Sequence, residues 1–207
     1  MSEATRQRDS SAVLSPGIGE YVIAEKLRLS SYLLDDPNEG LVATLTDLLG
    51  LYEDDEGATG LLTSMLTVLE ETEEGMVDLR VDHARLFVGP FEMLAPPYAS
   101  LYLEDGGRVY GAVTVAIRKC YRRFGLVQLS EIKEPEDHIS RLLEFLYYLA
   151  FEYARTGEEE YRDEFKRFGS VYVKSWYRRF FADMDSGATT GFYHLVAAFG
   201  SRCLPLD

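Results

Sequence analysis

Two Asp-His pairs, Asp82-His83 and Asp137-His138, are the residues of this sequence whose types best suit metal binding or proton transfer. The third histidine, His194, stands apart from both. Neighbouring residues on a helix point about 100° apart, and neither pair belongs to an HExxH or similar pattern by which zinc sites are recognised. A metal-dependent hydrolase using these pairs is therefore the less favoured alternative, and we expect no metal site.

Motifs of other enzyme classes do not occur in the sequence. There is no GxSxG elbow for a nucleophilic serine, and neither a GxxxxGK nor a GxGxxG loop for nucleotide phosphates. The two cysteines, Cys120 and Cys203, are too few for a disulfide framework or a zinc cluster, and this usage fits a reducing cytoplasm. We therefore expect a protein that is not an enzyme and has no cofactor.

Two stretches are better suited to binding. The first, from His83 to Tyr102, is dense in apolar and aromatic residues although much of it is expected to be a loop. Loops run over the surface, so aromatic residues there either pack inward or face a partner. Pro96-Pro97 holds the backbone extended at little entropic cost and would present Tyr98 in a fixed place.

The second stretch, Glu134-Pro135-Glu136-Asp137-His138, precedes the most apolar helix expected in the chain. From Ile139 to Tyr153, apolar residues recur at i, i+3, i+4 and i+7, and further apolar residues flank this stripe, which predicts a buried helix. Proline suits the first helical position, and the three carboxylates would favour the positive end of the helix dipole. We therefore expect this helix to begin at Pro135.

Hydrophobic periodicity predicts about eight helices joined by mostly short loops, and hence an all-α, single-domain helical bundle over residues 18–207. The expected helices cover residues 18–34, 41–49, 61–74, 76–88, 109–124, 135–153, 159–183 and 190–204. Asn38 is expected to cap the second helix, and Ser100 to Leu103 is the only strand-like fragment. Residues 1–17 are polar without periodicity and are expected to form a flexible N-terminal arm.

The chain of 207 residues is acidic, with a net charge of −14 that argues against a nucleic-acid partner. The acidity is concentrated: from Leu29 to Leu79 there is no Lys or Arg, and this span holds 13 of the 35 acidic residues. Such a region either attracts cationic partners or only aids solubility. No signal peptide and no apolar run long enough to span a membrane is evident, so we expect a cytoplasmic protein without stable membrane insertion.

Three motifs occur in order along the chain: Leu86-Phe87-x-Gly-Pro, then Pro-Pro-Tyr98-x-Ser-x-Tyr102, and then Glu134-Pro135-x-Asp137-His138. Together, in an acidic and all-helical chain, they resemble the TorD/DmsD/NarJ family of cytoplasmic chaperones for molybdenum-containing redox enzymes. The resemblance covers most of the chain. One position departs from the family pattern, because the aromatic residue expected three before Leu86 is His83.

The resemblance implies a chaperone that binds the twin-arginine signal peptide of a molybdoenzyme catalytic subunit in its apo form and delays export until the cofactor is inserted. By motif position, the peptide-binding residues it implies are His83, Leu86, Phe87, Pro97, Tyr98, Tyr102, Pro135, Asp137 and His138. Among them, Asp137 and His138 are expected to make direct contact, because short polar residues at a helix start are easily exposed. For Leu86, Phe87 and Pro135, a role in packing alone is an equal alternative.

One further alternative is a helical adaptor that binds the mature redox-enzyme subunit after its leader is removed. The resemblance also leaves the oligomeric state open between a monomer and a helix-swapped dimer, with residues 91–107 or 125–133 as the hinge.

Overall fold

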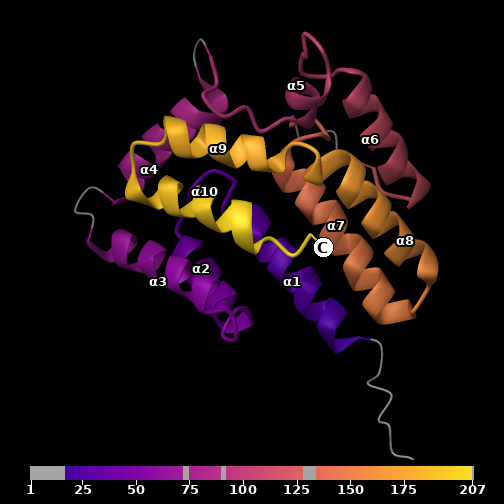
Figure 1. Cartoon of the computed structure of the whole chain (residues 1–207), viewed down its shortest axis with the longest axis horizontal. Coiled ribbons are helices and arrows are strands. Elements are labelled where there is room, and N and C mark those ends of the chain that lie inside the picture. The colour runs from indigo at the N-terminus through magenta and orange to yellow at the C-terminus, as the bar shows by residue number, and fades with distance from the viewer. Residues whose placement is uncertain (1–16, 72–74, 90–91, 128–133, 207) are drawn as a thin grey trace, which may run out of the picture.

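The computed structural model describes residues 17–71, 75–89, 92–127 and 134–206, and in these every regular element is a helix and none is a strand (Figure 1). The α-helices are α1 (Ile18–Tyr32), α2 (Leu41–Leu51), α3 (Glu56–Glu71), α4 (Gly75–His83), α5 (Ala99–Leu103), α6 (Ala112–Arg123), α7 (Ile139–Thr156), α8 (Glu159–Phe168), α9 (Tyr177–Gly187) and α10 (Gly191–Cys203). Two π-helical segments, η1 (Ala84–Val88) and η2 (Gly169–Lys174), continue α4 and α8. The all-α class is confirmed, with ten α-helices in the described segments where about eight were expected.

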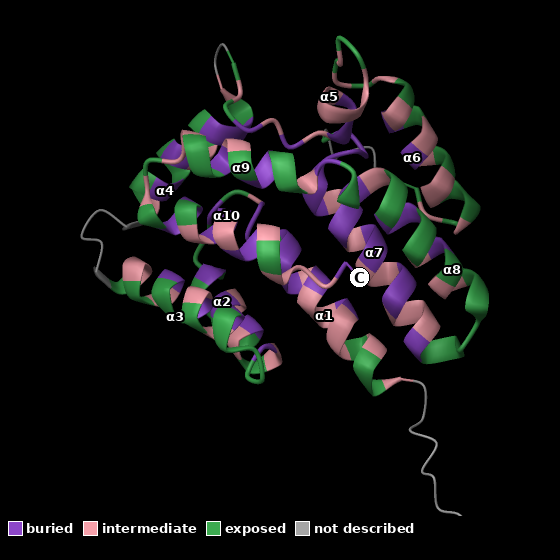
Figure 2. Ribbon diagram, in the orientation of Figure 1, coloured by how far each residue is buried: buried purple, intermediate pink, exposed green. Residues whose placement is uncertain are grey.

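Helix α7 is the centre of one half of the molecule, where it packs against α1 and α8. From Ile139 to Ala154 every residue of α7 is buried or half-buried, as its composition predicts (Figure 2). Helix α1 runs antiparallel to it, because Tyr21 near the start of α1 contacts Phe151 near the end of α7. In the other half, α10 packs against α3 and α9, and α2 joins α1 to α3. One continuous hydrophobic core links both halves.

Several expected boundaries are wrong, and each has a local cause. The helix expected from Pro135 begins only at Ile139, because His138 is its N-cap and has an extended backbone. The helix expected from Val109 begins at Ala112, since Tyr110 has a left-handed backbone (φ 67°) that no helix continues through. Asn38 does not cap α2: its side chain accepts a hydrogen bond from Gly40 N at 2.8 Å, and Gly40 is the N-cap.

The long helix expected over 159–183 is two helices. The wider π turn of η2 follows α8, and Trp176 then leaves the helical conformation (φ −140°). This break turns the Trp176 ring inward, where it is buried and stacks on Tyr102 at 4.9 Å. The short strand-like fragment Ser100 to Leu103 lies in the short helix α5, in agreement with the all-α class.

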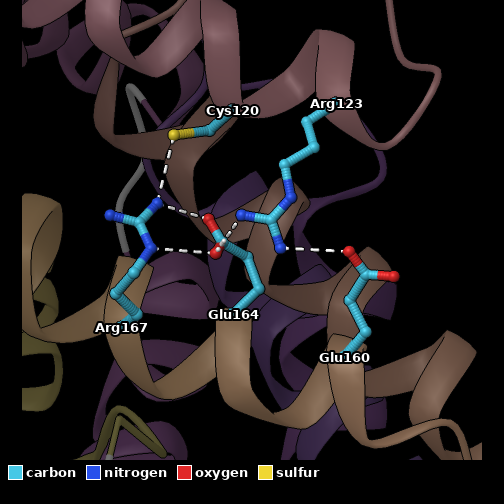
Figure 3. A network of polar contacts seen from close by, with 5 residues as sticks. All are labelled: Cys120, Arg123, Glu160, Glu164 and Arg167. Carbon is cyan, nitrogen blue, oxygen red and sulfur yellow. Dashed lines mark hydrogen bonds and ion pairs between the residues drawn. The ribbon is translucent and has the colours of Figure 1, made fainter.

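An ion-pair cluster joins α6 to α8 (Figure 3). Glu164 of α8 is buried and accepts hydrogen bonds from Arg167 (2.8 Å) on its own helix and from Arg123 (3.2 Å) on α6. Arg123 also donates to Glu160 at 3.1 Å, and Arg167 lies 3.2 Å from the Cys120 sulfur. A buried carboxylate is stable only when donors satisfy it, so this cluster fixes the position of α6 against α8.

Within the described segments, none of the helices has the length and apolarity required to cross a membrane. Residues 1–16, which include nearly all of the expected N-terminal arm, lie outside the described part, as do residues 128–133 of the second expected hinge.

Candidate functional site

The second and third sequence motifs lie side by side. Residues 97–99 run antiparallel to residues 137–139, with an isolated bridge between Tyr98 and His138. Ala99 N donates to the Asp137 carbonyl at 3.0 Å, and Ile139 N donates to the Pro97 carbonyl at 2.8 Å. The structure therefore brings together two motifs that are well separated in the chain.

Asp137 holds this junction together from within. Its side chain has 0% exposure, its Oδ2 accepts from Ser100 N at 2.9 Å, and its Oδ1 accepts from Thr114 Oγ1 at 2.9 Å. It thus ties the start of α5 and the start of α6 to the start of α7. The expectation that Asp137 is exposed for direct contact is wrong, because both oxygens of its short side chain are occupied by these buried donors.

His138 is also buried, so the expectation that its side chain is exposed at the start of the helix is wrong as well. Its Nδ1 lies 2.7 Å from Ser140 Oγ and accepts from Ser140 N, so the ring caps α7. Burial, together with the positive charge of Arg141, lowers the pKa of His138 to about 3. Pro135 is buried beside it, and its carbonyl accepts from His138 N at 3.1 Å.

The carboxylates on either side of Pro135 were expected to interact with the dipole of the following helix, but each is paired with a side chain instead. Glu136 is buried and forms a two-pronged ion pair with Arg118 of α6. Glu134 is exposed, and its Oε2 accepts from the Tyr98 hydroxyl at 2.9 Å. The ring of Tyr98, half-buried, meets His138 edge-on at 5.5 Å.

The first motif supplies an aromatic wall. Leu86 and Phe87 are buried in η1, and His83 meets Phe87 edge-on at 4.9 Å. Tyr193 of α10 lies against both rings, 5.7 Å from Phe87 and 6.3 Å from His83. Burial lowers the pKa of His83, against the opposing charges of Asp36 and Asp35. The ring in the position of the family's aromatic residue is therefore held mainly neutral and packed against other rings.

Tyr102 lies apart from this group. Its ring stacks on Trp176, its hydroxyl donates to Asp183 Oδ2 of α9 at 3.0 Å, and the Arg179 guanidinium lies over its ring. Of the nine predicted residues, His83 and Phe87 form one ring pair, Tyr98 and His138 form another, and the two histidines are close enough to act on each other electrostatically. Buried neighbours in the same motifs are Leu86, Pro97, Pro135 and Asp137. Tyr102 faces α9 instead.

A cavity of about 410 Å³ opens beside α1, α6 and α7. Its lining is mostly aromatic and apolar, and its residues include Tyr32, Tyr121, Leu126, Phe145, Tyr147 and Tyr148. The pair Arg141 and Glu144 and the side chain of Glu136 add charge to this lining. No sequence motif pointed to this cavity, because the composition of α7 indicates only a helix that packs on all sides.

A second cavity of about 260 Å³ lies between the end of α1, the start of α2 and α10. It shares Tyr32 with the larger cavity, and Tyr193 lines it from the aromatic wall. Asp35 also lines it. Tyr32, with 41% exposure, therefore stands where the two cavities meet.

Three carboxylates act on the side chains near the two cavities. Asp35 and Asp36, in the turn after α1, act electrostatically on His83, as does Glu134. Asp35 also acts on Arg141 and Glu144 of the larger cavity. The sequence predicts an acidic region but does not single out Asp35 and Asp36, because Asp35-Asp36-Pro37 indicates only the end of a helix.

Protein donors occupy the carboxylates of both Asp-His pairs. Asp82 is buried, and its carboxylate already accepts from Thr189 N, Thr190 N, Thr190 Oγ1 and Arg85. Asp137 is occupied in the same way. Among the residues that the structure describes, no group of three or more His, Cys, Asp or Glu side chains is placed to hold a metal ion.

Comparison with known proteins agrees with these features. Residues 51–182 match the sequence model of the family described as nitrate reductase delta subunit. The chain belongs to this family. The resemblance to the TorD/DmsD/NarJ group predicted from the three motifs is thereby confirmed.

Its relatives in this family include named chaperones. The chaperone protein TorD of Aliivibrio salmonicida is 30% identical over 159 residues, which cover 72% of this chain and 73% of that protein. The Tat proofreading chaperone DmsD of Salmonella typhimurium is 29% identical over 112 residues, 54% of this chain and 52% of that protein. The fold is similar to that of a putative redox enzyme maturation protein from Archaeoglobus fulgidus, with a TM-score of 0.54, 24% identity and coverage of 86% and 91% of the two chains.

Proposed function

We propose that this protein is a dedicated, non-catalytic chaperone that binds the twin-arginine signal peptide of a molybdenum-containing oxidoreductase subunit. In this role it retains the apo subunit in the cytoplasm and delays its export until the cofactor is inserted. The membership of a family with TorD and DmsD chaperones supports the general role. The observation that supports signal-peptide binding in particular is the acidic turn Asp35-Asp36, which lies beside the two cavities and near the aromatic motif residue His83.

The arrangement suits the chemistry of such a peptide, which has two arginines followed by an apolar run. Guanidinium groups form their strongest contacts with carboxylates, through charge-assisted and often bidentate hydrogen bonds. Asp35, Asp36 and Glu134 provide carboxylates on one edge of the site. The larger cavity provides an apolar surface of the size that a few side chains of a helical leader can fill by helix-in-groove docking.

The motif residues then have two kinds of role. Tyr98 and His83 present partly exposed rings between the acids, on which an arginine can stack. Asp137, His138, Pro97 and Pro135 fix the backbone that carries Tyr98, and so act by position. Phe87 of η1 packs against the His83 ring and holds it in place.

The test is titration calorimetry with a synthetic twin-arginine leader peptide of a molybdoenzyme catalytic subunit. The variant Asp35→Asn/Asp36→Asn should weaken binding at least tenfold, since each desolvated charge pair that is broken costs about 2–5 kcal/mol. The control Asp47→Asn/Glu53→Gln removes the same charge from exposed positions of the same acidic region and should change affinity less than threefold.

A leader with both arginines changed to alanine should not bind wild type, and one with two lysines should bind more weakly, because lysine lacks the bidentate fork. Equal affinity of the two acidic variants would contradict the site. Failure of a well-folded wild type to bind any leader would contradict the function.

The adaptor function is the second candidate, and one feature favours it. Val77 and Val81 of α4 and Val88 of η1 are more than half exposed along one continuous stretch of the chain, and exposed apolar residues of this kind are typical of contact with a folded partner. This function predicts that the mature subunit without its leader is retained by wild type and released by Val77→Ser/Val81→Ser. The leader-binding function predicts that these two substitutions leave leader affinity unchanged.

A further inference from the structure

The segment that precedes α1 has the same order of chemical groups as the proposed ligand. It reads Thr5-Arg6-Gln7-Arg8 and, after three polar residues, Ala12-Val13-Leu14. Two arginines are therefore followed by a short apolar run, in the same chain direction as in a twin-arginine leader. The segment lies outside the described residues, but the place where it joins the fold, at Gly17 and Ile18, is described.

A partly exposed track on α1 leads from that place to the candidate site. Ile18, Tyr21, Glu25, Arg28 and Tyr32 follow one another at intervals of three or four residues and thus lie on one face. Ile18 is 76% exposed and Tyr21 is 37% exposed, although both are apolar in large part. The face ends at Arg28 and Tyr32, which line the larger cavity.

Aromatic residues of α7 run beside this track. Tyr21 meets Phe151 at 5.5 Å between ring centroids, and Phe151 meets Tyr147 at 5.8 Å. Tyr147 in turn lines the larger cavity. A continuous surface of aromatic side chains therefore connects the start of α1 with the cavity and, through Tyr32, with Asp35.

The length of the segment fits the length of the track. From Gly17 to Tyr32 the helix rises about 22 Å at 1.5 Å per residue. An extended chain spans at most about 3.3 Å per residue, so Ala12-Val13-Leu14 can reach about 10–17 Å along α1, to the level of Arg28. Arg8 and Arg6 can reach about 30 Å or more, which extends past Tyr32 to Asp35 and Asp36.

We propose that residues 5–14 dock along this α1–α7 track as an internal occupant of the leader-binding site. Ala12-Val13-Leu14 lie at the larger cavity, and Arg6 and Arg8 pair with the carboxylates at Asp35 and Asp36. This inference rests on the proposed function, because it assigns to the segment the contacts that a leader would make. Charge complementarity supports it, since the far end of the track lies in the region of the chain that has no basic residue.

An internal occupant need not bind tightly in order to matter. A tethered segment has an effective concentration of about 1 mM. With an intrinsic dissociation constant of about 0.1 mM, it would fill the site about nine-tenths of the time and weaken leader binding about tenfold. Peptides that lack one arginine or the apolar run would then fail to displace it, so the segment would sharpen selectivity by competition.

The experiment compares leader affinity by calorimetry for wild type, a variant lacking residues 2–15, and Arg6→Gln/Arg8→Gln. The control Glu3→Gln/Asp9→Asn removes two charges of the opposite sign from the same segment. We expect the deletion and the arginine variant to bind the leader about five to twenty times more tightly than wild type. The control should bind it no more tightly than wild type. The deletion and the arginine variant should unfold at a slightly lower temperature than wild type, because an occupant that binds only the folded state stabilises that state.

A second measurement adds a synthetic peptide of residues 2–16 to the deletion variant. It should bind, compete with the leader, and fail to bind when Asp35→Asn/Asp36→Asn is also present. Equal leader affinity for all variants, with no binding of the peptide, would overturn the inference and leave the proposed function intact. Absence of leader binding by every variant, with the peptide still bound, would instead contradict the proposed function alone.

Discussion

Asp137 illustrates how a motif residue can matter without touching a ligand. Its two carboxylate oxygens each accept from a buried donor, Ser100 N and Thr114 Oγ1, on two other helices. A substitution here would move the backbone that carries Tyr98. Its effect on binding and its effect on stability should therefore appear together.

We predict that Asp137→Ala lowers the free energy of unfolding by about 2–4 kcal/mol, because two buried donors lose their acceptor. Urea denaturation at pH 7 measures this. Asp105→Ala, at an exposed acid in the turn after α5, should stay within about 0.5 kcal/mol of wild type. An Asp137→Ala protein as stable as wild type but unable to bind the leader would show direct contact instead.

His138 gives the protein a defined pH response. Its pKa is lowered to about 3 in the folded state by burial, while a histidine in an unfolded chain has a pKa of about 6.5. Between these values the unfolded chain binds a proton that the folded chain does not, so stability falls as the pH falls. The full contribution is present only above about pH 6.5.

We predict that His138 lowers the free energy of unfolding by about 1.4 kcal/mol for each unit by which the pH falls between about pH 6 and pH 4. His138→Asn retains a side chain that can cap α7 but does not titrate. Unfolding free energies of wild type and variant should therefore converge as the pH is lowered, since the contributions of all other groups cancel in the difference. Parallel pH profiles would mean that His138 is not kept neutral by the fold.

At the scale of elements, α9 and α10 approach each other closely at one glycine. Gly200 lies so near the ring of Phe181 that a Cβ atom there would come within 2.1 Å of it. Phe181 is buried and packs on Phe180, so it has no room to move away. The absence of a side chain at Gly200 thus sets the distance between the two helices.

Gly200→Ala should destabilise the protein by about 3 kcal/mol, which is the cost of forcing atoms into a filled core. Gly60→Ala in the interior of α3 is the matched control, since a Cβ atom at this position would have nothing within 4 Å of it. The control should stabilise the protein by about 0.5–1 kcal/mol through helix propensity. Thermal unfolding of both variants tests the pair, and a similar effect of the two substitutions would refute the close contact.

The elements show what could be predicted from the sequence. The sequence predicts helix α7 because its apolar period is unbroken from Ile139 to Tyr153. The helix runs on to Thr156, where Gly157 ends it in a left-handed conformation (φ 71°). The sequence does not predict that α7 starts at Ile139, because Pro135 and three carboxylates suit a helix start as well as a turn whose acids pair with side chains elsewhere in the fold. The break between α8 and α9 was missed because helical spacing continues through η2, where only the hydrogen-bond pattern changes.

The site shows a similar division. The motifs identified Tyr98 and His138 as parts of one site, and the structure places them in direct contact. Their burial, and that of Asp137, depends on donors elsewhere in the chain that no local pattern reveals. Asp35 and Tyr147 are not among the predicted site residues, because their positions beside the two cavities result from the packing of α1 against its neighbours and leave no trace in the spacing of residues.

At the scale of the whole molecule, charge is separated. The span without basic residues covers the end of α1, then α2, α3 and the first turns of α4, which lie on one side of the molecule (Figure 1). A net charge of −14 attracts a cationic leader from a distance. Long-range attraction acts on the rate of association, whereas close ion pairs act mainly on the rate of dissociation.

This distinction leads to a kinetic prediction for the same pair of variants. Asp47→Asn/Glu53→Gln reduces charge away from the cavities and should slow association of the leader by a factor of about two, with dissociation unchanged. Asp35→Asn/Asp36→Asn should raise the dissociation rate at least tenfold, because it removes the partners of desolvated guanidinium groups. Stopped-flow fluorescence with a labelled leader at about 50 and 500 mM salt separates the effect on association from the effect on dissociation. The higher salt concentration should slow association about tenfold and abolish the effect of the substitutions at Asp47 and Glu53. If both variants changed only association, the leader's arginines would be held by the general field of the acidic side and not by the turn after α1.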